Sequence, residues 1–364
     1  MKANVLVTAA GSIVAQGIIK SLKLANDKNN SSHRGDGIHY NIISADMNPM
    51  AAGLYRSHSG IIIPPSTSPD YIDAVARACQ KMRVDAVFCG SDDELFILAN
   101  GRRQIHEEAG AEVMVGDDRA LSIARDKWKT YEYCIANRLP CAPSCMPEDS
   151  DGLVHEYGFP VIVKPRQGYG SLHTYLVSDQ AGLNHAISSI TRVGWHPIVQ
   201  KYIPGDLEFT SGVTIDRTAR YVMSSISMRK ILKNGQTHKA FIDDYQSVRK
   251  SAEEASLKLG TFGAVNVQAK IGKEGEMPQI FEINPRFSAT CPMRAVAGIN
   301  EPDIVFRNSV MGEDIKVSSY DRLFCARYHN EVYVPLRAYE QAVKAQPDSD
   351  FIIKDTGSFI ADYF

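Results

Sequence analysis

The sequence predicts an α/β domain followed by a longer α+β region, and three observations lead to this prediction. Strand-like and helix-like segments alternate through residues 1–117, which is typical of βαβ units around a parallel sheet. Further along, paired apolar segments joined by Gly-containing turns are typical of antiparallel hairpins. The 364 residues also exceed the size of one small domain, so we expect two or three compact units.

The first domain is predicted from the order of its strands and helices. Gly11 follows the first strand at a turn, and the pair Pro69-Asp70 suits the first turn of a later helix. The polar stretch 26–37 is predicted to be a loop or a poorly ordered insertion. The expected strands are 4–8, 40–45, 61–63 and 86–89, and the expected helices are 13–24, 68–82 and 92–108.

The second region begins near Asp117 and mixes helices with strands. A Pro- and Cys-containing loop follows its first two helices and ends at Asp151. The expected helices are 118–123, 127–137, 178–191 and 252–259, and the expected strands are 161–164, 174–177, 198–202, 208–215, 219–227, 264–271 and 279–283.

Composition excludes several classes of protein. The formal net charge of −2 gives no reason to expect a nucleic-acid or membrane partner through bulk electrostatics. No apolar run reaches the roughly 20 residues that span a bilayer. The seven cysteines are scattered without a CxxC pair, which indicates reduced thiols rather than a disulfide framework or a zinc site. Because the N-terminus also lacks the pattern of a signal peptide, we expect a cytoplasmic protein.

The strongest candidate for a chemical site is a hairpin near the end of the second region. If it folds about Gly275, Gln268 on the first strand lies opposite Glu282 on the second. Asn284 follows Glu282 by two residues and therefore points to the same face. Oxygen-bearing side chains of this kind suit Mg²⁺, and Arg286 two residues later could hold a phosphate or carboxylate oxygen. The alternative is a hairpin with an ordinary polar solvent face.

A second candidate is Lys164, which ends an apolar strand and is followed by Gly168 and Gly170. A buried lysine at a strand end needs an anionic partner, and glycines beside it let backbone N–H groups approach phosphate oxygens closely. A plain surface hairpin would give the same pattern. The segment is not a Walker A loop, because GxxxxGK[ST] is absent.

A third candidate is the segment 198–209, an apolar strand followed by Pro204-Gly205. This pattern suits a hinge between domains whose backbone N–H and C=O groups could bind an adenine edge. Glu208 could then accept hydrogen bonds from ribose hydroxyls. The alternative is a strand, a turn and another strand without a ligand.

Together these segments resemble the ATP-grasp superfamily, and most closely its carbamoyl-phosphate-synthase-like branch. The resemblance rests on NVQ at 266–268 and FEINPRFS at 281–288. It implies a metal site at Gln268, Glu282 and Asn284, with Arg286 near the transferred phosphate. It further assigns Lys127 and Lys164 to the nucleotide phosphates, Gly168, Gly170 and Ser171 to a flexible phosphate-covering loop, Lys201, Tyr202 and Ile203 to adenine, and Glu208 to ribose.

The resemblance also implies a domain organisation. Residues 1–117 would form a Rossmann-like pre-ATP-grasp domain, and residues 118–312 a two-subdomain ATP-grasp fold with a smaller lid at about 125–202 and then the metal-binding subdomain. Residues 313–364 would be a C-terminal extension, which carries no motif. Three roles stay open for this extension: completing the ATP-grasp sheet, capping the acceptor site or forming a homodimer contact.

The implied function is that of an ATP-dependent carbon–nitrogen ligase. Such an enzyme uses ATP and Mg²⁺ (or Mn²⁺) to join a small-molecule carboxylate to an amine through an acyl phosphate. The alternatives are an enzyme that phosphorylates bicarbonate or another small carboxylate, and a nucleotide-binding protein without catalysis. Two departures from the family pattern concern the metal and the loop. Many ATP-grasp ligases have Glu where this chain has Gln268, and the 166–171 loop has fewer glycines than is common.

Two charged clusters and one glycine turn remain. Arg229 and Lys230 belong to a basic cluster, from which Arg229 is predicted as a catalytic residue, with a solvated strand edge as the alternative. The acidic run 91–94 favours helix capping over contact with a substrate amine. Nicotinamide binding is disfavoured, since the turn after the first strand has one glycine, Gly11, where the GxGxxG fingerprint needs three.

Overall fold

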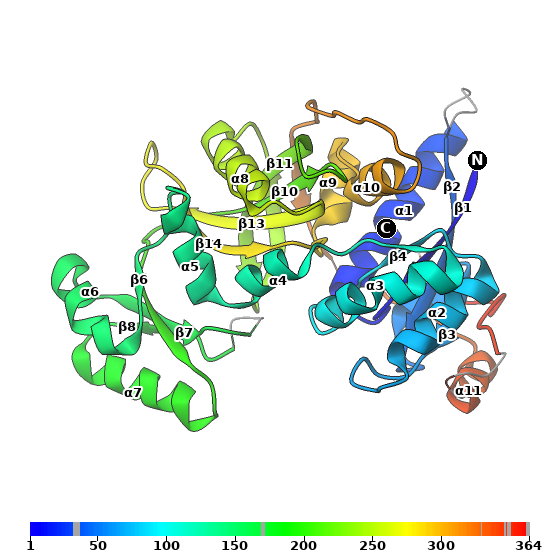
Figure 1. The fold of residues 1–364 in the computed structure, drawn as a ribbon, viewed down its shortest axis with the longest axis horizontal. Coiled ribbons are helices and arrows are strands. Elements are labelled where there is room, and N and C mark those ends of the chain that lie inside the picture. The colour runs from blue at the N-terminus through cyan, green and yellow to red at the C-terminus, as the bar shows by residue number, and fades with distance from the viewer. Residues whose placement is uncertain (32–36, 169–171, 329, 346, 348–350, 362–364) are drawn as a thin grey trace.

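The computed structural model describes residues 1–31, 37–168, 172–328, 330–345, 347 and 351–361. Three lobes lie in a row, each built on its own sheet (Figure 1). The N-terminal lobe and the lid lobe lie at the two ends, and the central lobe lies between them. The predicted fold class, an α/β domain followed by a two-part α+β fold, is therefore confirmed.

The N-terminal lobe holds a five-stranded parallel sheet in the order β3-β2-β1-β4-β5. Its strands are β1 (Lys2–Val7), β2 (His39–Asp46), β3 (Ser59–Ile62), β4 (Ala86–Phe88) and β5 (Glu112–Val113), and its helices are α1 (Ile13–Ser31), the 3₁₀ turn η1 (Ala52–Tyr55), α2 (Tyr71–Met82) and α3 (Leu95–Ala109).

Both faces of this sheet are covered, as a parallel sheet requires. Alternate residues of β1 point to opposite sides, so that Val5 and Val7 pack with α1 while Leu6 packs with α2 and α3. The cluster that contains Val5 continues into the central lobe through Ile226 and Phe287. The first lobe therefore shares a hydrophobic core with the central lobe.

The central lobe is a six-stranded antiparallel sheet in the order β14-β13-β10-β11-β12-β15. Asp117 and Asp126 begin its first two helices by accepting hydrogen bonds from Ala120 N and Trp128 N, both at 2.9 Å. Its strands are β10 (Leu207–Ile215), β11 (Val222–Lys233), β12 (Gln236–Ile242), β13 (Gly263–Ile271), β14 (Gln279–Asn284) and β15 (Leu323–Ala326), and its helices are α4 (Asp118–Arg125), α5 (Lys127–Ala136), α8 (Gln246–Leu259), α9 (Cys291–Ala297) and α10 (Glu301–Ser309).

The lid lobe is a four-stranded antiparallel sheet in the order β6-β9-β7-β8, with its helices packed on it (Figure 1). Its elements are β6 (Ser144–Cys145), the 3₁₀ turn η2 (Pro147–Asp149), α6 (Ser150–Tyr157), β7 (Val161–Pro165), β8 (Tyr175–Val177), α7 (Gln180–Arg192) and β9 (Pro197–Lys201).

The C-terminal segment joins the first and central lobes. Its strand β15 pairs with β12 and so extends the central sheet. The chain then returns to the N-terminal lobe, where Ile353 bridges Gly60 and Ala342 of α11 (Leu336–Lys344) packs beside Leu54. Of the three roles left open for this segment, extension of the sheet is the one that the fold shows directly.

Two sequence expectations about the elements were wrong. The helix predicted at 13–24 continues as α1 to Ser31, so residues 26–31 of the expected loop are helical. The strand expected at 219–227 is the longer β11, which contains Arg229 and Lys230 and forms a hairpin with the unpredicted β12. Among the described helices, none combines the length and apolarity needed to cross a bilayer.

Candidate active site

The hairpin β13–β14, called here the metal hairpin, has the register that the sequence predicts. Gln268 lies directly opposite Glu282, and Asn266 lies opposite Asn284. The turn between the strands includes Gly275, whose φ of 88° suits glycine. Gln268, Glu282 and Asn284 therefore meet on one face of the central sheet.

Five polar side chains form a continuous network that we call the polar wall. Lys230 Nζ lies 2.9 Å from a carboxylate oxygen of Glu208 and also donates to Gln268 Oε1. Gln268 Nε2 donates to Glu282 at 2.8 Å, and Asn284 Nδ2 donates to the other oxygen of Glu282 at 3.1 Å. The network thus connects the predicted ribose residue Glu208 with the predicted metal ligands.

Lys164 lies at the end of β7 and is buried, with 7% of its surface exposed. Its ammonium donates to Gln200 Oε1 at 2.9 Å and lies 5.6 Å from the centre of the Phe281 ring. The pKa of Lys164 is lowered to about 8, mainly by burial and also by nearby Lys127, against the opposite effects of Glu282 and Glu208. A desolvated ammonium group of this kind favours the binding of an anion.

Lys127 and the lid turn meet at one point. Lys127, the first residue of α5, donates from Nζ to Gly168 O at 2.9 Å, and its backbone N–H donates to Arg166 O. Gly168 has a φ of 127°, which favours glycine. Gly170 and Ser171, also predicted as phosphate contacts, lie outside the described residues.

The predicted adenine residues Lys201, Tyr202 and Ile203 lie where β9 leaves the lid sheet. The backbone N–H of Lys201 donates to Pro143 O at 2.8 Å, and the Lys201 ammonium lies over the Tyr157 ring. All three residues line the same cavity as the polar wall, whose member Asn284 alone lies outside the lining.

That cavity, called here the central cavity, has a volume of about 960 Å³ and is bounded by all three lobes. The predicted residues that line it are Lys127, Lys164, Gly168, Lys201, Tyr202, Ile203, Glu208, Gln268, Glu282 and Arg286. Segments far apart in the sequence therefore supply one continuous surface.

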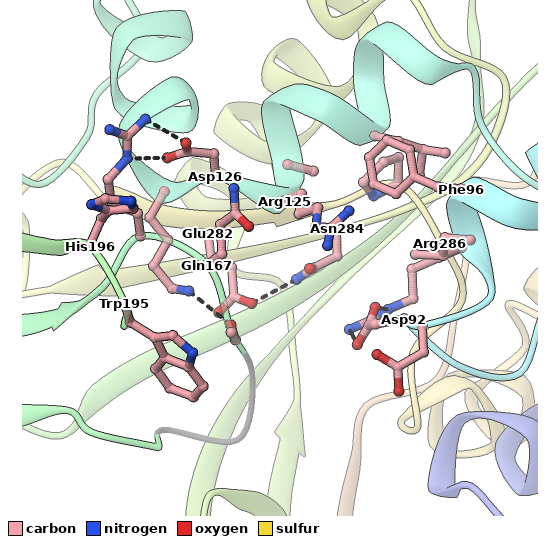
Figure 2. Close-up of a pocket in the computed structure, with 18 of the residues that line it drawn as sticks. Asp92, Phe96, Arg125, Asp126, Gln167, Trp195, His196, Glu282, Asn284 and Arg286 are labelled. Atoms are coloured by element: carbon pink, nitrogen blue, oxygen red, sulfur yellow. Dashed lines mark hydrogen bonds and ion pairs between the residues drawn. The ribbon is translucent and has the colours of Figure 1, made fainter. Parts of the chain in front are cut away.

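A second space, the side cavity of about 800 Å³, adjoins the first and shares Glu282 and Arg286 with it. Figure 2 shows Glu282 and Asn284 on one side of this cavity and Arg286 on the other, next to Asp92. Arg286 Nε donates to Asp92 at 2.6 Å and Nη2 donates to its other oxygen at 3.2 Å. The arginine predicted beside the transferred phosphate is thus held by the N-terminal lobe.

The geometry does not support Arg229 as a catalytic residue, and it points to Lys230 instead. Arg229 lines neither cavity, and its guanidinium lies 4.4 Å from the centre of the Phe241 ring. Neighbouring residues of a strand point to opposite faces, so the side chain of Lys230 reaches the central cavity. The alternation could have revealed this, because Lys230 shares a strand face with the buried Ile226 and Met228.

Asp92 and Glu94 of the acidic run 91–94 form hydrogen bonds and an ion pair with other elements instead of capping a helix. Glu94 precedes α3 without a side-chain hydrogen bond to its first turn. Its buried carboxylate accepts from Thr8 Oγ1 and from the Tyr71 hydroxyl, both at 2.7 Å, and burial raises its pKa. With Asp92 bound to Arg286, the favoured interpretation as helix caps is not supported for these two residues.

The donor set fits one Mg²⁺ better than a larger metal cluster. Glu282 supplies a carboxylate and Asn284 an amide oxygen, which are hard ligands. Gln268 is less suited, because its Oε1 already accepts from the Lys230 ammonium. Among the residues that the structure describes, no group of three or more His, Cys, Asp or Glu could hold a metal. Phosphate oxygens and water would therefore complete the coordination.

Sequence reasoning missed Arg327, which comes from the C-terminal segment. Arg327 lines the central cavity together with Ser12, Ser91 and Thr290 and donates from Nη2 to Ala289 O. Its position follows from the pairing of β15 with β12 rather than from any local motif. A site residue whose position depends on strand pairing can be identified only from the folded structure.

Comparisons with known proteins agree with this architecture. A family model described as an ATP-grasp domain matches residues 124–290, which include the whole metal hairpin, and one described as a PylC-like N-terminal domain matches residues 17–114. The chain is 25% identical over 209 residues to the carbamoyl phosphate synthase large chain of Corynebacterium glutamicum, covering 53% of this chain and 18% of that one. It is 32% identical over 96 residues to the D-alanine–D-alanine ligase of Pediococcus pentosaceus, covering 26% and 27%.

Solved structures show the same fold. The N5-carboxyaminoimidazole synthetase of Staphylococcus aureus, complexed with ADP, superposes with a TM-score of 0.66 at 16% identity over 87% of this chain and 79% of that one. The biotin carboxylase of Campylobacter jejuni, in a β,γ-ATP complex, has a TM-score of 0.66 at 18% identity over 86% and 72%. Residues 124–290 thus carry an ATP-grasp domain. A PylC-like N-terminal domain precedes it, and carbamoyl phosphate synthase large chains are among the homologues of the chain.

Proposed function

We propose that this protein is an ATP- and Mg²⁺-dependent carboxylate–amine ligase that forms an amide through an acyl phosphate and releases ADP and phosphate. The polar wall beside Lys164 is the observation that carries the proposal. Together they bring two carboxylates, two amides and two buried lysines close to one another, and all of these groups except Asn284, which lines the adjoining side cavity, line the central cavity. A surface of this kind suits a polyphosphate with its metal, because both signs of charge lie within reach.

Each residue would have a role that follows from its position in the site. Lys127 and Lys164 would neutralise the nucleotide phosphates, while Lys201, Tyr202 and Ile203 would bind adenine and Glu208 would bind ribose. Glu282 and Asn284 would hold Mg²⁺, which when bound supplies charge neutralisation and orients phosphate oxygens.

Arg286 would stabilise the charge that develops on the transferred phosphoryl group. In the first step, a carboxylate oxygen of the substrate bonds to the γ-phosphorus as the bond from that phosphorus to the ADP oxygen breaks. In the second, the amine nitrogen bonds to the acyl carbon, phosphate leaves and the nitrogen loses a proton to solvent. No protein nucleophile is needed. Cys291 agrees with this, since it is fully buried and burial raises the pKa of its thiol to about 12.

A screen for ADP release tests the reaction class. The protein would be incubated with ATP, Mg²⁺ and pairs of carboxylates and amines drawn from amino acids and sugar acids, with mass detection of the product. Release that requires both partners supports the ligase. Release with a carboxylate or bicarbonate alone, trapped by hydroxylamine, would replace it with a carboxylate-phosphorylating enzyme.

The substitution Glu282→Gln tests the site itself. Outer-shell partners of a metal are already worth about 10- to 100-fold, so loss of a direct ligand should lower turnover by more than about 100-fold. Circular dichroism should remain unchanged, because Glu282 is partly exposed. Glu107→Gln on the exposed surface of α3 is the matched control and should retain full turnover. Turnover of Glu282→Gln at the level of this control would remove the proposed metal site.

A further inference from the structure

A third cavity, of about 640 Å³, lies away from the candidate active site and shares no lining residue with its two cavities. It is an open cavity lined by α1, by β2, by η1 with the segment after it and by the C-terminal segment, which returns to the edge of the first sheet at Ile353. In Figure 1 this segment runs beside β3. We call this space the basic cavity.

The lining of the basic cavity carries an excess of positive charge. Its lining includes three cations, Lys23, Arg56 and Lys354, and one carboxylate, that of Asp355. His58 also lines it, with its Nδ1 accepting a hydrogen bond from Ile42 N at 3.0 Å. Two further charged groups lie close by without lining it. Lys20 is near Arg56, and Asp27 is near Lys23.

Lys23 and Arg56 are the two cations on which the site depends, and in the part of the chain that the structure describes the nearby carboxylates of Asp27 and Asp355 do not pair with them. Within the described ranges of the chain, neither Lys23 nor Arg56 has an ion pair or a side-chain hydrogen bond. Both are partly buried, and burial lowers the pKa of each, with Arg56 lowering that of Lys23 further. Holding like charges together in a partly desolvated place is unfavourable, and an anion between them would relieve the repulsion.

The shape and chemistry of the lining select the anion. The planar fork of Arg56 can donate to two oxygens of one phosphate, and Lys23 adds a point charge beside it. Ser57 and Thr356 contribute hydroxyl groups to the same lining. A phosphate dianion matches this density of positive charge better than a carboxylate, which carries a single charge.

We propose that the basic cavity is a second anion site, separate from the nucleotide site, that binds inorganic phosphate or the phosphate group of a small phosphomonoester. The proposal does not depend on the ligase reaction. Arg56 and Lys23 provide the main contacts, and the C-terminal segment closes the site over the N-terminal lobe.

Hydrogen–deuterium exchange on the full chain tests the site directly. Inorganic phosphate at millimolar concentration should protect peptides that cover 54–58 and 353–360, and acetate at the same concentration should not. A phosphomonoester such as phosphoserine forms a second arm. Stronger protection by the ester would identify a phosphorylated metabolite as the ligand, and stronger protection by phosphate would identify the free ion.

A pair of double variants removes equal charge from two places. Lys23→Gln with Arg56→Gln should weaken phosphate protection at least about tenfold, since charged hydrogen bonds are worth about 1.5–3 kcal/mol each. Lys233→Gln with Lys250→Gln, both exposed, should leave it unchanged. Equal weakening of phosphate protection in both double variants would show that the effect arises from the total charge of the protein. Protection by phosphate in the wild-type protein that is confined to peptides of the central cavity would overturn the proposal, and this measurement does not depend on the folding of any variant.

Discussion

The side chain of Lys164 shows how a residue acquires its chemistry from its surroundings. A lysine in water has a pKa near 10.5, and burial lowers that of Lys164 to about 8. The same ammonium lies beside Gln200 and faces the cavity that holds Glu282. In the protein without nucleotide, the Lys164 ammonium therefore loses its charge within a range of pH where the protein can be studied.

We expect nucleotide affinity to fall as pH rises through about 8, because Lys164 loses the proton that attracts phosphate. Titration of a non-hydrolysable ATP analogue from about pH 7 to 9.5 measures this, with a limiting slope of about tenfold per pH unit for one proton. Lys164→Met should bind weakly with a flatter profile. Equal slopes in the two proteins would contradict the role of Lys164.

The same pKa has an opposite consequence for stability. Between pH 8 and the ordinary value of 10.5, the unfolded chain binds a proton at Lys164 that the folded chain has lost. The contribution of this residue to the free energy of unfolding therefore increases with pH in that range.

Lys230 and Arg229 form a natural pair for comparison, since they are neighbours with opposite orientations. Lys230→Met leaves Glu208 and Gln268 without their shared partner, and a charged hydrogen bond is worth about 1.5–3 kcal/mol. We expect the KM for ATP to rise about tenfold or more. Arg229→Met should change it less than about twofold. Steady-state kinetics that give the two variants equal KM values would show that Lys230 has no special role.

At the scale of elements, the strand-to-loop junctions bring distant backbone segments close together. Gly90 follows β4, and a Cβ atom there would lie 2.0 Å from Thr8 O and 2.7 Å from Ala15 Cβ. Glycine is therefore required where β1, α1 and β4 meet, and this junction also lines the central cavity. The packing of the first lobe thus determines where the loop that carries Asp92 begins.

Two glycine-to-alanine substitutions should have effects of opposite sign. Gly90→Ala must separate β1 from β4 and should lower the free energy of unfolding by about 3 kcal/mol or more. Gly152 lies in α6 with nothing within 4 Å of an added Cβ, so Gly152→Ala should raise it by about 0.5–1 kcal/mol. Denaturant titration measures both. A stable Gly90→Ala protein would contradict the close approach at this junction.

At the scale of the whole molecule, the ion pair between Asp92 and Arg286 connects the N-terminal lobe with the end of the metal hairpin. The two residues are 194 positions apart in the sequence. Arg286 is largely covered, with 15% of its side chain exposed, while 35% of the Asp92 side chain is exposed. The pair fixes the guanidinium at the meeting point of the two cavities.

Asp92→Asn should lower the free energy of unfolding by about 1–2 kcal/mol, a value reduced by the partial exposure of the pair. It should also lower turnover, because Arg286 is no longer held in place. Asp93→Asn, one residue further on and exposed, is the control and should change stability by less than about 0.5 kcal/mol. If both variants unfold alike, the ion pair contributes nothing to the joint between the lobes.

The sequence by itself determined the fold class, the presence of an ATP-grasp domain and the register of the metal hairpin. Strand alternation and a Gly-containing turn are local properties, so they are sufficient to place Gln268 opposite Glu282. The order of strands and helices in the first lobe followed from equally local patterns. The roles assigned to the site residues and the limits of the domains stay predictions.

Only the tertiary structure decided which charged groups meet. Contacts such as Lys230 with Glu208 and Arg286 with Asp92 join segments whose separation no local pattern encodes. Local alternation could have oriented Lys230, but its partners depend on how β10, β11 and β13 pair. Arg327 reaches the central cavity only because β15 adds to the far edge of the same sheet. Side-chain periodicity is a property of one strand, whereas the chemistry of a site depends on which strands become neighbours.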